Sequence, residues 1–160
     1  MNEVTATPRA APRWFLANLV RIHAGHAETG AYSLLEFAGP RGDMPPLHVH
    51  ERDTEIFYVL DGELSLFVGE SVTRVDAGGV VVAPAGIPHV YRVDADEARW
   101  LVIASPGADF ERFVEQASVP AEAETLPPHH EPTPDEVATL TALAAEHGIE
   151  LLGPPGTLPS

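Results

Sequence analysis

Residues 42–62, GDMPPLHVHERDTEIFYVLDG, combine two histidines, a glutamate and a short apolar run. His48 and His50 are two residues apart, and in a β-strand the side chains at positions i and i+2 point to the same face. Glu55 follows five residues after His50, directly before the apolar residues 56–60. We therefore expect the two imidazoles to share a face that a carboxylate reaches after a short turn, forming one side of a metal site.

A third histidine, His89, follows the constrained turn PAGIP at residues 84–88 and begins a predicted strand, so we expect it to face the same interior. Imidazole nitrogens and a carboxylate suit a borderline divalent transition metal: Fe, Mn, Ni, Co or Zn. On an octahedral ion, His48, His50, Glu55 and His89 would leave two positions open, as catalytic sites do. The alternative is that these histidines are ordinary surface or core residues and that Glu55 is a charge at a strand edge.

Five residues near these ligands are predicted to line a substrate pocket. Four of them alternate along the strands of Glu55 and His89 and so share the ligand face, and the fifth directly precedes the ligands. They are Met44, Phe57, Val59, Tyr91 and Val93. The alternative for all five is ordinary core packing.

The remaining histidines fall in predicted loops or at a predicted helix end. They are His23, His26, His129, His130 and His147. We interpret each as a solvated side chain rather than a ligand.

Short apolar segments separated by turn residues fill most of the chain up to residue 106. The predicted strands are 14–22, 31–37, 47–50, 55–60, 63–68, 71–75, 80–83, 89–93 and 98–105. Asp61-Gly62, between two of them, is a strong two-residue hairpin signal. Short strands at this spacing, with almost no helix among them, predict an all-β sandwich or barrel.

After residue 106 the pattern of apolar residues changes from that of strands to that of helices. Residues 109–116 carry apolar side chains at helical spacing, which predicts a helix with Asp109 as its cap. We expect a flexible N-terminal arm at residues 1–12, a β-barrel at residues 13–106, and C-terminal helices and a tail at residues 107–160 that pack on the barrel.

A second helix is predicted from Thr133 to His147. Threonine at the cap, proline next to it and Glu136 three residues after the cap form the pattern of a capping box. Residues 149–152 are predicted to add an edge strand or to pack on the barrel, and residues 153–160 to be irregular.

Composition excludes several classes of function. The 160 residues suit one domain, and the formal net charge of −15, with nine basic residues, argues against nucleic acid or an anionic membrane as partner. Cysteine is absent, which excludes disulfides, thiolate metal sites and a cysteine nucleophile. No apolar run reaches the ~18 residues of a transmembrane helix, and no signal peptide pattern is present, so we expect a cytoplasmic protein.

Two groups of spaced residues resemble the paired motifs of the cupin superfamily. The first is Gly42-x5-His48-x-His50-x4-Glu55-x6-Gly62. The second is Gly78-x5-Pro84-x-Gly86-x2-His89. The 15 residues between Gly62 and Gly78 are a typical short spacer, and the one departure is Val93, where the second motif usually has asparagine. Since that position is not a metal ligand in the family, the ligand set is unaffected.

The resemblance implies a double-stranded β-helix, or cupin jelly roll, with a C-terminal helical extension. Residues 36–68, 84–93 and 104–118 further resemble bacterial single-domain quercetin 2,3-dioxygenase-like cupins. That likeness implies a metal-dependent dioxygenase that cleaves an aromatic or enolic small molecule with O2, with Glu55 as the catalytic base for a substrate hydroxyl, in a homodimer. A non-oxidative cyclase, isomerase or lyase of secondary metabolism, and a non-catalytic small-molecule-binding cupin, stay open as alternatives.

Overall fold

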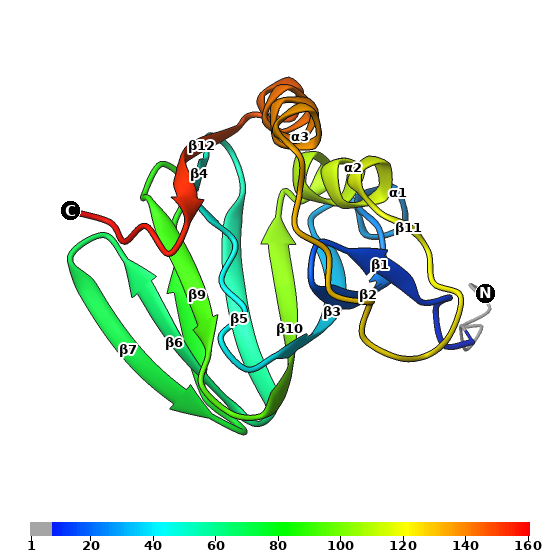
Figure 1. Cartoon of the computed structure of the whole chain (residues 1–160), viewed down its shortest axis with the longest axis horizontal. Coiled ribbons are helices and arrows are strands. Elements are labelled where there is room, and N and C mark those ends of the chain that lie inside the picture. The colour runs from blue at the N-terminus through cyan, green and yellow to red at the C-terminus, as the bar shows by residue number, and fades with distance from the viewer. Residues whose placement is uncertain (1–7) are drawn as a thin grey trace.

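The structure, a computed structural model, describes residues 8–160 and consists mostly of antiparallel strands (Figure 1). Residues 1–7 of the predicted arm lie outside the described residues. The strands are β1 (Arg13–Phe15), β2 (Asn18–Ala24), β3 (Ser33–Pro40), β4 (Pro46–His50), β5 (Thr54–Asp61), β6 (Glu63–Val68), β7 (Ser71–Asp76), β8 (Val80–Ala83), β9 (His89–Val93), β10 (Glu97–Ser105), β11 (Val119–Pro120) and β12 (Ile149–Pro155). The helices are α1 (His26–Thr29), α2 (Ala108–Ala117) and α3 (Pro134–Glu146).

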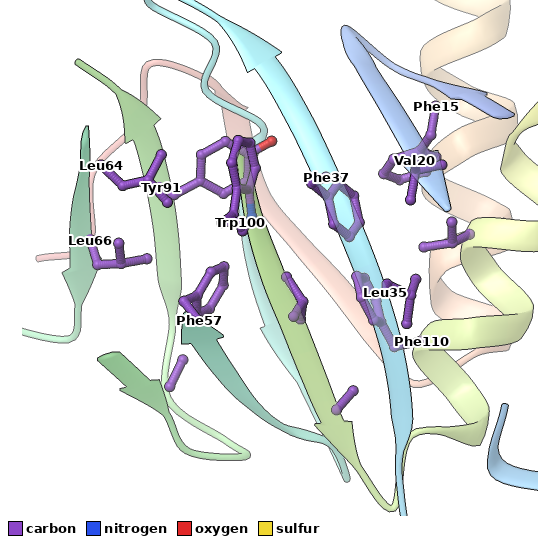
Figure 2. Close-up of a cluster of buried hydrophobic side chains, with 14 of the residues drawn as sticks. Phe15, Val20, Leu35, Phe37, Phe57, Leu64, Leu66, Tyr91, Trp100 and Phe110 are labelled. Atoms are coloured by element: carbon purple, nitrogen blue, oxygen red, sulfur yellow. The ribbon is translucent and has the colours of Figure 1, made fainter. Parts of the chain in front are cut away.

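Two antiparallel sheets enclose the core. Seven strands form one sheet in the order β11-β1-β2-β3-β10-β5-β8, and five form the second in the order β12-β4-β9-β6-β7. Inward side chains of both sheets belong to one cluster, in which Leu64, Leu66 and Tyr91 of the smaller sheet lie opposite Phe57 and Trp100 of the larger one (Figure 2). The predicted all-β jelly roll with a C-terminal helical extension is confirmed.

The predicted strand 14–22 is wrong, because the chain turns back in its middle. Leu16 and Ala17 form a two-residue turn, and Phe15 of β1 pairs with Asn18 of β2. Leu16 has a φ of 52°, which costs a residue with a Cβ atom about 1–2 kcal/mol. The turn residues Leu16 and Ala17 include neither glycine nor proline, and Asn18 directly after them is the one weak turn signal in this stretch.

The predicted hairpin at Asp61-Gly62 is also wrong. Strand β5 pairs with β8 and β10, whereas β6 pairs with β7 and β9, so this turn carries the chain from one sheet to the other. Gly62 has a φ of 81°, and a Cβ atom on it would lie 2.6 Å from the carbonyl oxygen of Glu97. Both the backbone conformation and the close approach of β10 therefore require glycine.

Helix α2 packs its apolar face on the barrel through Phe110, Phe113 and Val114, at the predicted helical spacing. Its N-cap, however, is Gly107 and not Asp109. The side chain of Asp109 instead accepts a hydrogen bond from Nε of Arg52 at 2.7 Å. A cap position is defined by where the backbone leaves the helix, which the apolar spacing alone does not locate.

Helix α3 begins with the predicted capping box, in which Thr133 and Glu136 exchange hydrogen bonds. The strand predicted at residues 149–152 is confirmed as the start of β12, which pairs with β4 at the edge of the smaller sheet. Residues 153–155 continue that strand, so the expectation of an irregular tail holds only beyond them. None of the helices within residues 8–160 has the length and hydropathy that spanning a lipid bilayer requires.

We expect Gly62→Ala to lower the free energy of unfolding by about 3 kcal/mol or more, because the methyl group adds a steric clash to an unfavourable φ. Gly42→Ala is the matched control, since Gly42 has a φ of 80° and an added Cβ atom would have open space for 4 Å around it. This control should cost only about 1–2 kcal/mol. Urea unfolding followed by tryptophan fluorescence measures both. Equal losses would contradict the close approach at Gly62.

Candidate metal centre

The four predicted ligands come together inside the barrel from three strands. His48 and His50 lie on β4, Glu55 on β5 and His89 on β9. Strands β4 and β9 place His48 directly opposite His89, and one ligand atom from each of the four residues lies within 4.8 Å of the others. A divalent ion needs donor atoms converging in this way.

Backbone carbonyls fix the tautomers of two of the histidines. Nδ1 of His48 lies 2.8 Å from the carbonyl oxygen of Pro46, and Nδ1 of His89 lies 2.9 Å from that of Ile87. A carbonyl oxygen can only accept a hydrogen bond, so each Nδ1 carries the proton. In the neutral ring, the lone pair is then on Nε2, where a metal ligand needs it.

A close pair of acceptor atoms lies at the centre of the cluster. Nε2 of His89 is 2.7 Å from Oε2 of Glu55, and both side chains are buried. With the proton of neutral His89 on Nδ1, a lone pair would face a carboxylate oxygen. Such a pair requires a cation between the two atoms, either a proton or a metal ion.

In the described part of the chain, the ring of His50 is left without hydrogen bonds. Among residues 8–160, neither ring nitrogen of His50 has a hydrogen-bond partner, although the side chain is buried. Its Nε2 lies 3.2 Å from Oε2 of Glu55, outside hydrogen-bonding geometry. A buried unsatisfied polar group costs about 1–3 kcal/mol, and a metal ion bound at this nitrogen would remove that cost.

The charge states of His48 and Glu55 match those of metal ligands, whereas His89 shares a proton with Glu55. Burial, with His89 and His50 nearby, lowers the pKa of His48 to about 3, which keeps this imidazole neutral. Burial opposes ionisation of Glu55, but His50 and His89 outweigh it and hold its pKa well below the usual value. Burial likewise opposes the charge on His89, and the hydrogen bond to Glu55 raises its pKa nonetheless. The residues therefore fit a divalent transition metal, which would replace the proton shared by His89 and Glu55.

An apolar pocket of about 590 Å³, counted out to its open mouth, leads to this cluster. His48, His50 and Glu55 form part of its lining. Half of the remaining lining residues are aromatic, and they come from both sheets, the N-terminal hairpin and α2: Phe15, Phe37, Phe57, Tyr91, Trp100, Phe110 and Phe113.

The five residues predicted to line the pocket have different positions. Phe57 and Tyr91 lie in the wall. Val59 and Val93 are buried in the core and do not reach the pocket. Met44 packs against a separate apolar cluster formed by Leu47, Phe67 and Val90. These three residues alternate along their strands with the residues that face the interior, so this cluster lies on the outer face of the smaller sheet.

Sequence reasoning missed most of the wall because it comes from distant segments. Trp100 and Val102 could have been found by the alternation of β10, and Phe110 and Phe113 by their helical spacing. Leu140 of α3 and the inward residues of β12 have no such signal, since nothing in the sequence indicates that the C-terminal segment folds back over the barrel.

Tyr91 is held in the wall by a buried polar cluster. Its hydroxyl lies 2.9 Å from Oδ2 of Asp43 and 3.1 Å from Oδ1 of Asn18, and Nδ2 of Asn18 donates to the same Asp43 oxygen at 2.7 Å. Burial and the neighbouring Asp43 raise the pKa of Tyr91 well above its usual value, so the phenol stays neutral. The ring is therefore fixed in position beside Trp100, at a centroid distance of 4.8 Å.

The converging histidines and glutamate lie within a match to the cupin domain family, which covers residues 36–104. The chain belongs to the cupin superfamily. It is 31% identical over 110 residues to quercetin 2,3-dioxygenase of Bacillus subtilis strain 168, covering 68% of this chain and 32% of that protein. This cupin thus spans about a third of the length of that relative.

Two further relatives are shorter. An uncharacterized protein of Streptomyces coelicolor is 37% identical over 90 residues, covering 56% of this cupin and 80% of that protein. The structure of the polyketide cyclase RemF from Streptomyces resistomycificus superposes with a TM-score of 0.51 at 25% identity, covering 66% of this chain and 80% of that one.

We expect His48→Ala to lower the amount of Mn(II), Ni(II) or Zn(II) that the protein retains after dialysis by at least about tenfold, because one of the four donor atoms is lost. His129→Ala is the matched control, since this histidine is exposed and lies outside the cluster. Elemental analysis gives metal per chain, and circular dichroism verifies that both variants fold. Unchanged metal content in His48→Ala would refute the assignment of the site.

Proposed function

We propose that this cupin is a metal-dependent oxygenase of the quercetin 2,3-dioxygenase type, which acts on an aromatic or enolic small molecule. The observation that carries the proposal is an aromatic-walled pocket with His48, His50 and Glu55 in its lining. The likeness to the Bacillus subtilis quercetin 2,3-dioxygenase supports it.

One divalent transition metal (Fe, Mn, Ni, Co or Zn) would be held by His48, His50, Glu55 and His89. When bound, such an ion supplies Lewis acidity and a site at which substrate and O2 can meet. The surrounding apolar side chains exclude water, which strengthens electrostatic interactions within the site.

The protein's own groups would bind the substrate and accept its proton. The rings of Phe57 and Phe110 offer faces and edges against which a planar substrate can pack. Glu55, ionised and buried, is the base that takes the proton from a substrate hydroxyl. Both atoms of O2 would enter the deprotonated substrate as a carbon–carbon bond is cleaved.

A second candidate is a non-oxidative cyclase, isomerase or lyase of secondary metabolism. The likeness to the polyketide cyclase RemF favours it, because the same pocket and ligands suit a phenolic polyketide without any use of O2. A non-catalytic cupin that only binds its small molecule is the remaining alternative.

We also propose that the protein is a homodimer, joined through the outer face of the larger sheet. Outward positions of β5 and β8 are apolar where water-facing strands usually carry polar residues: Ile56, Tyr58, Val80 and Val82. Tyr58, Val80 and Val82 are 39%, 51% and 49% exposed. Leu101 and Ile103 of β10 extend the same face. An apolar patch of this kind is typical of an interface between subunits.

Oxygen-electrode assays with flavonols and polyketide-like phenols, after loading with each metal, test the dioxygenase. We expect the wild type to consume one O2 per substrate molecule and Glu55→Gln to lower kcat by about 100-fold or more, because the proton acceptor is lost. Glu51→Gln, at an exposed neighbouring carboxylate, should leave kcat unchanged, and metal content is measured in all three proteins. Turnover under argon without oxygen uptake would refute the dioxygenase and favour the cyclase, and saturable binding without turnover would favour the binding protein.

Sedimentation analysis tests the dimer. The wild type should sediment at about twice the chain mass of 17.1 kDa, and Val82→Glu should shift it toward the monomer because a charge is placed in the apolar face. Val72→Glu is the control, since Val72 is 65% exposed on β7 of the other sheet. A monomeric wild type, or an equal effect of both variants, would rule out this interface.

A further inference from the structure

Leu16, in the turn between β1 and β2, has a backbone conformation that is unfavourable for leucine. Leu16 is the one residue other than glycine that has a positive φ within residues 8–160. At the first position of a two-residue turn, glycine or asparagine adopts this conformation readily. The Leu16 side chain is also 45% exposed, so burial in the core does not offset the strain. Folding therefore gives no reason for leucine at this position.

The turn is fixed on both sides. Before it, Phe15 is buried and its ring lies edge-on to Phe113 at 5.7 Å and to Phe37 at 6.3 Å. After it, Asn18 is buried and donates to Asp43 at 2.7 Å. Because Phe15 is anchored in the pocket wall and Asn18 in the polar contacts with Asp43 and Tyr91, the turn holds Leu16 in one place.

That place is the lining of the pocket. Leu16 contributes to the pocket together with Leu140 of α3, although the two belong to opposite ends of the chain. A side chain that lines a pocket and is still half exposed lies at its mouth. The metal ligand His50, which lines the same pocket, is only 2% exposed and lies at the inner end.

We propose that Leu16 is a specificity-determining residue, whose side chain contacts the apolar part of an aromatic ligand that extends from the metal centre to the pocket mouth. The unfavourable backbone conformation of Leu16 is retained because its side chain contributes to ligand binding and not to the stability of the fold. The aromatic class of the ligand rests on the proposed function, and the contact itself does not depend on any reaction.

The test uses the neutral aromatic probe N-phenyl-1-naphthylamine, whose fluorescence reports binding to the full chain. Leu16→Ala keeps the unfavourable φ and removes most of the side chain, whereas Leu16→Asn removes the apolar side chain and suits the turn. We expect both variants to raise the Kd of the probe about fivefold, as the loss of a half-exposed leucine contact implies. Leu16→Asn should also raise Tm by roughly 2–4 °C, because the strain is relieved, and Leu16→Ala should not.

Leu158→Asn is the matched control, because Leu158 is 48% exposed and lies outside the pocket lining. Its Kd for the probe should equal that of the wild type. An unchanged Kd in either Leu16 variant, an equal rise in Leu158→Asn, or the absence of saturable binding to the wild type would overturn the inference.

The oxygen-uptake assay distinguishes an error in the proposed function from an error in the role of Leu16. Weaker probe binding in both Leu16 variants, without oxygen uptake by the wild type, would support the role of Leu16 and reject the oxygenase. Oxygen uptake by the wild type with an unchanged probe Kd in the Leu16 variants would support the oxygenase and reject the role of Leu16.

Discussion

The contact between Glu55 and His89 links the two sheets at the centre of the molecule. Glu55 belongs to β5 of the larger sheet and His89 to β9 of the smaller one, and their side-chain atoms approach to 2.7 Å without exposure to water. A slip of one residue in either strand would turn one of these two polar side chains toward the outer face of its sheet, so the register of both sheets is constrained by this pair. A buried carboxylate among imidazoles requires a positive charge, and the aromatic pocket adjoins the place where that charge must be.

The local geometry of the ligands could be predicted from the sequence, because it depends only on alternation along short strands and on turn residues. His48 and His50 share a face for that reason, and the capping box at Thr133 was predictable for a similar one. The two errors in the strands have a different cause. A turn without glycine conceals the reversal at Leu16, and the turn at Gly62 indicates that the chain bends but not which strands it will pair with. The pocket wall depends on contacts between distant segments, which local patterns do not encode.

The candidate metal centre and the C-terminal extension depend on each other through Asp53, which lies between His50 and Glu55 in the sequence. Its buried carboxylate accepts hydrogen bonds from the backbone N–H of Gly107 at 2.7 Å and of Phe110 at 3.0 Å. It thus satisfies backbone donors at the start of α2 while it fixes the loop between the two candidate ligands His50 and Glu55. Phe110 in turn places its ring 5.4 Å from that of His50. The helix is therefore part of the support of the site.

Strand β12, which pairs with β4, is the last of the described strands to be synthesised. Strand β4 carries His48 and His50 and is hydrogen-bonded to β9 on one side and to β12 on the other. The ribosome releases β12 after every other described strand, so this edge of β4 has no partner strand until then. Ile149 and Leu151 close the pocket beside the histidines only when that last strand docks. Until β12 has been synthesised, the strand that carries the two histidines thus lacks the part of the pocket wall that lies beside it.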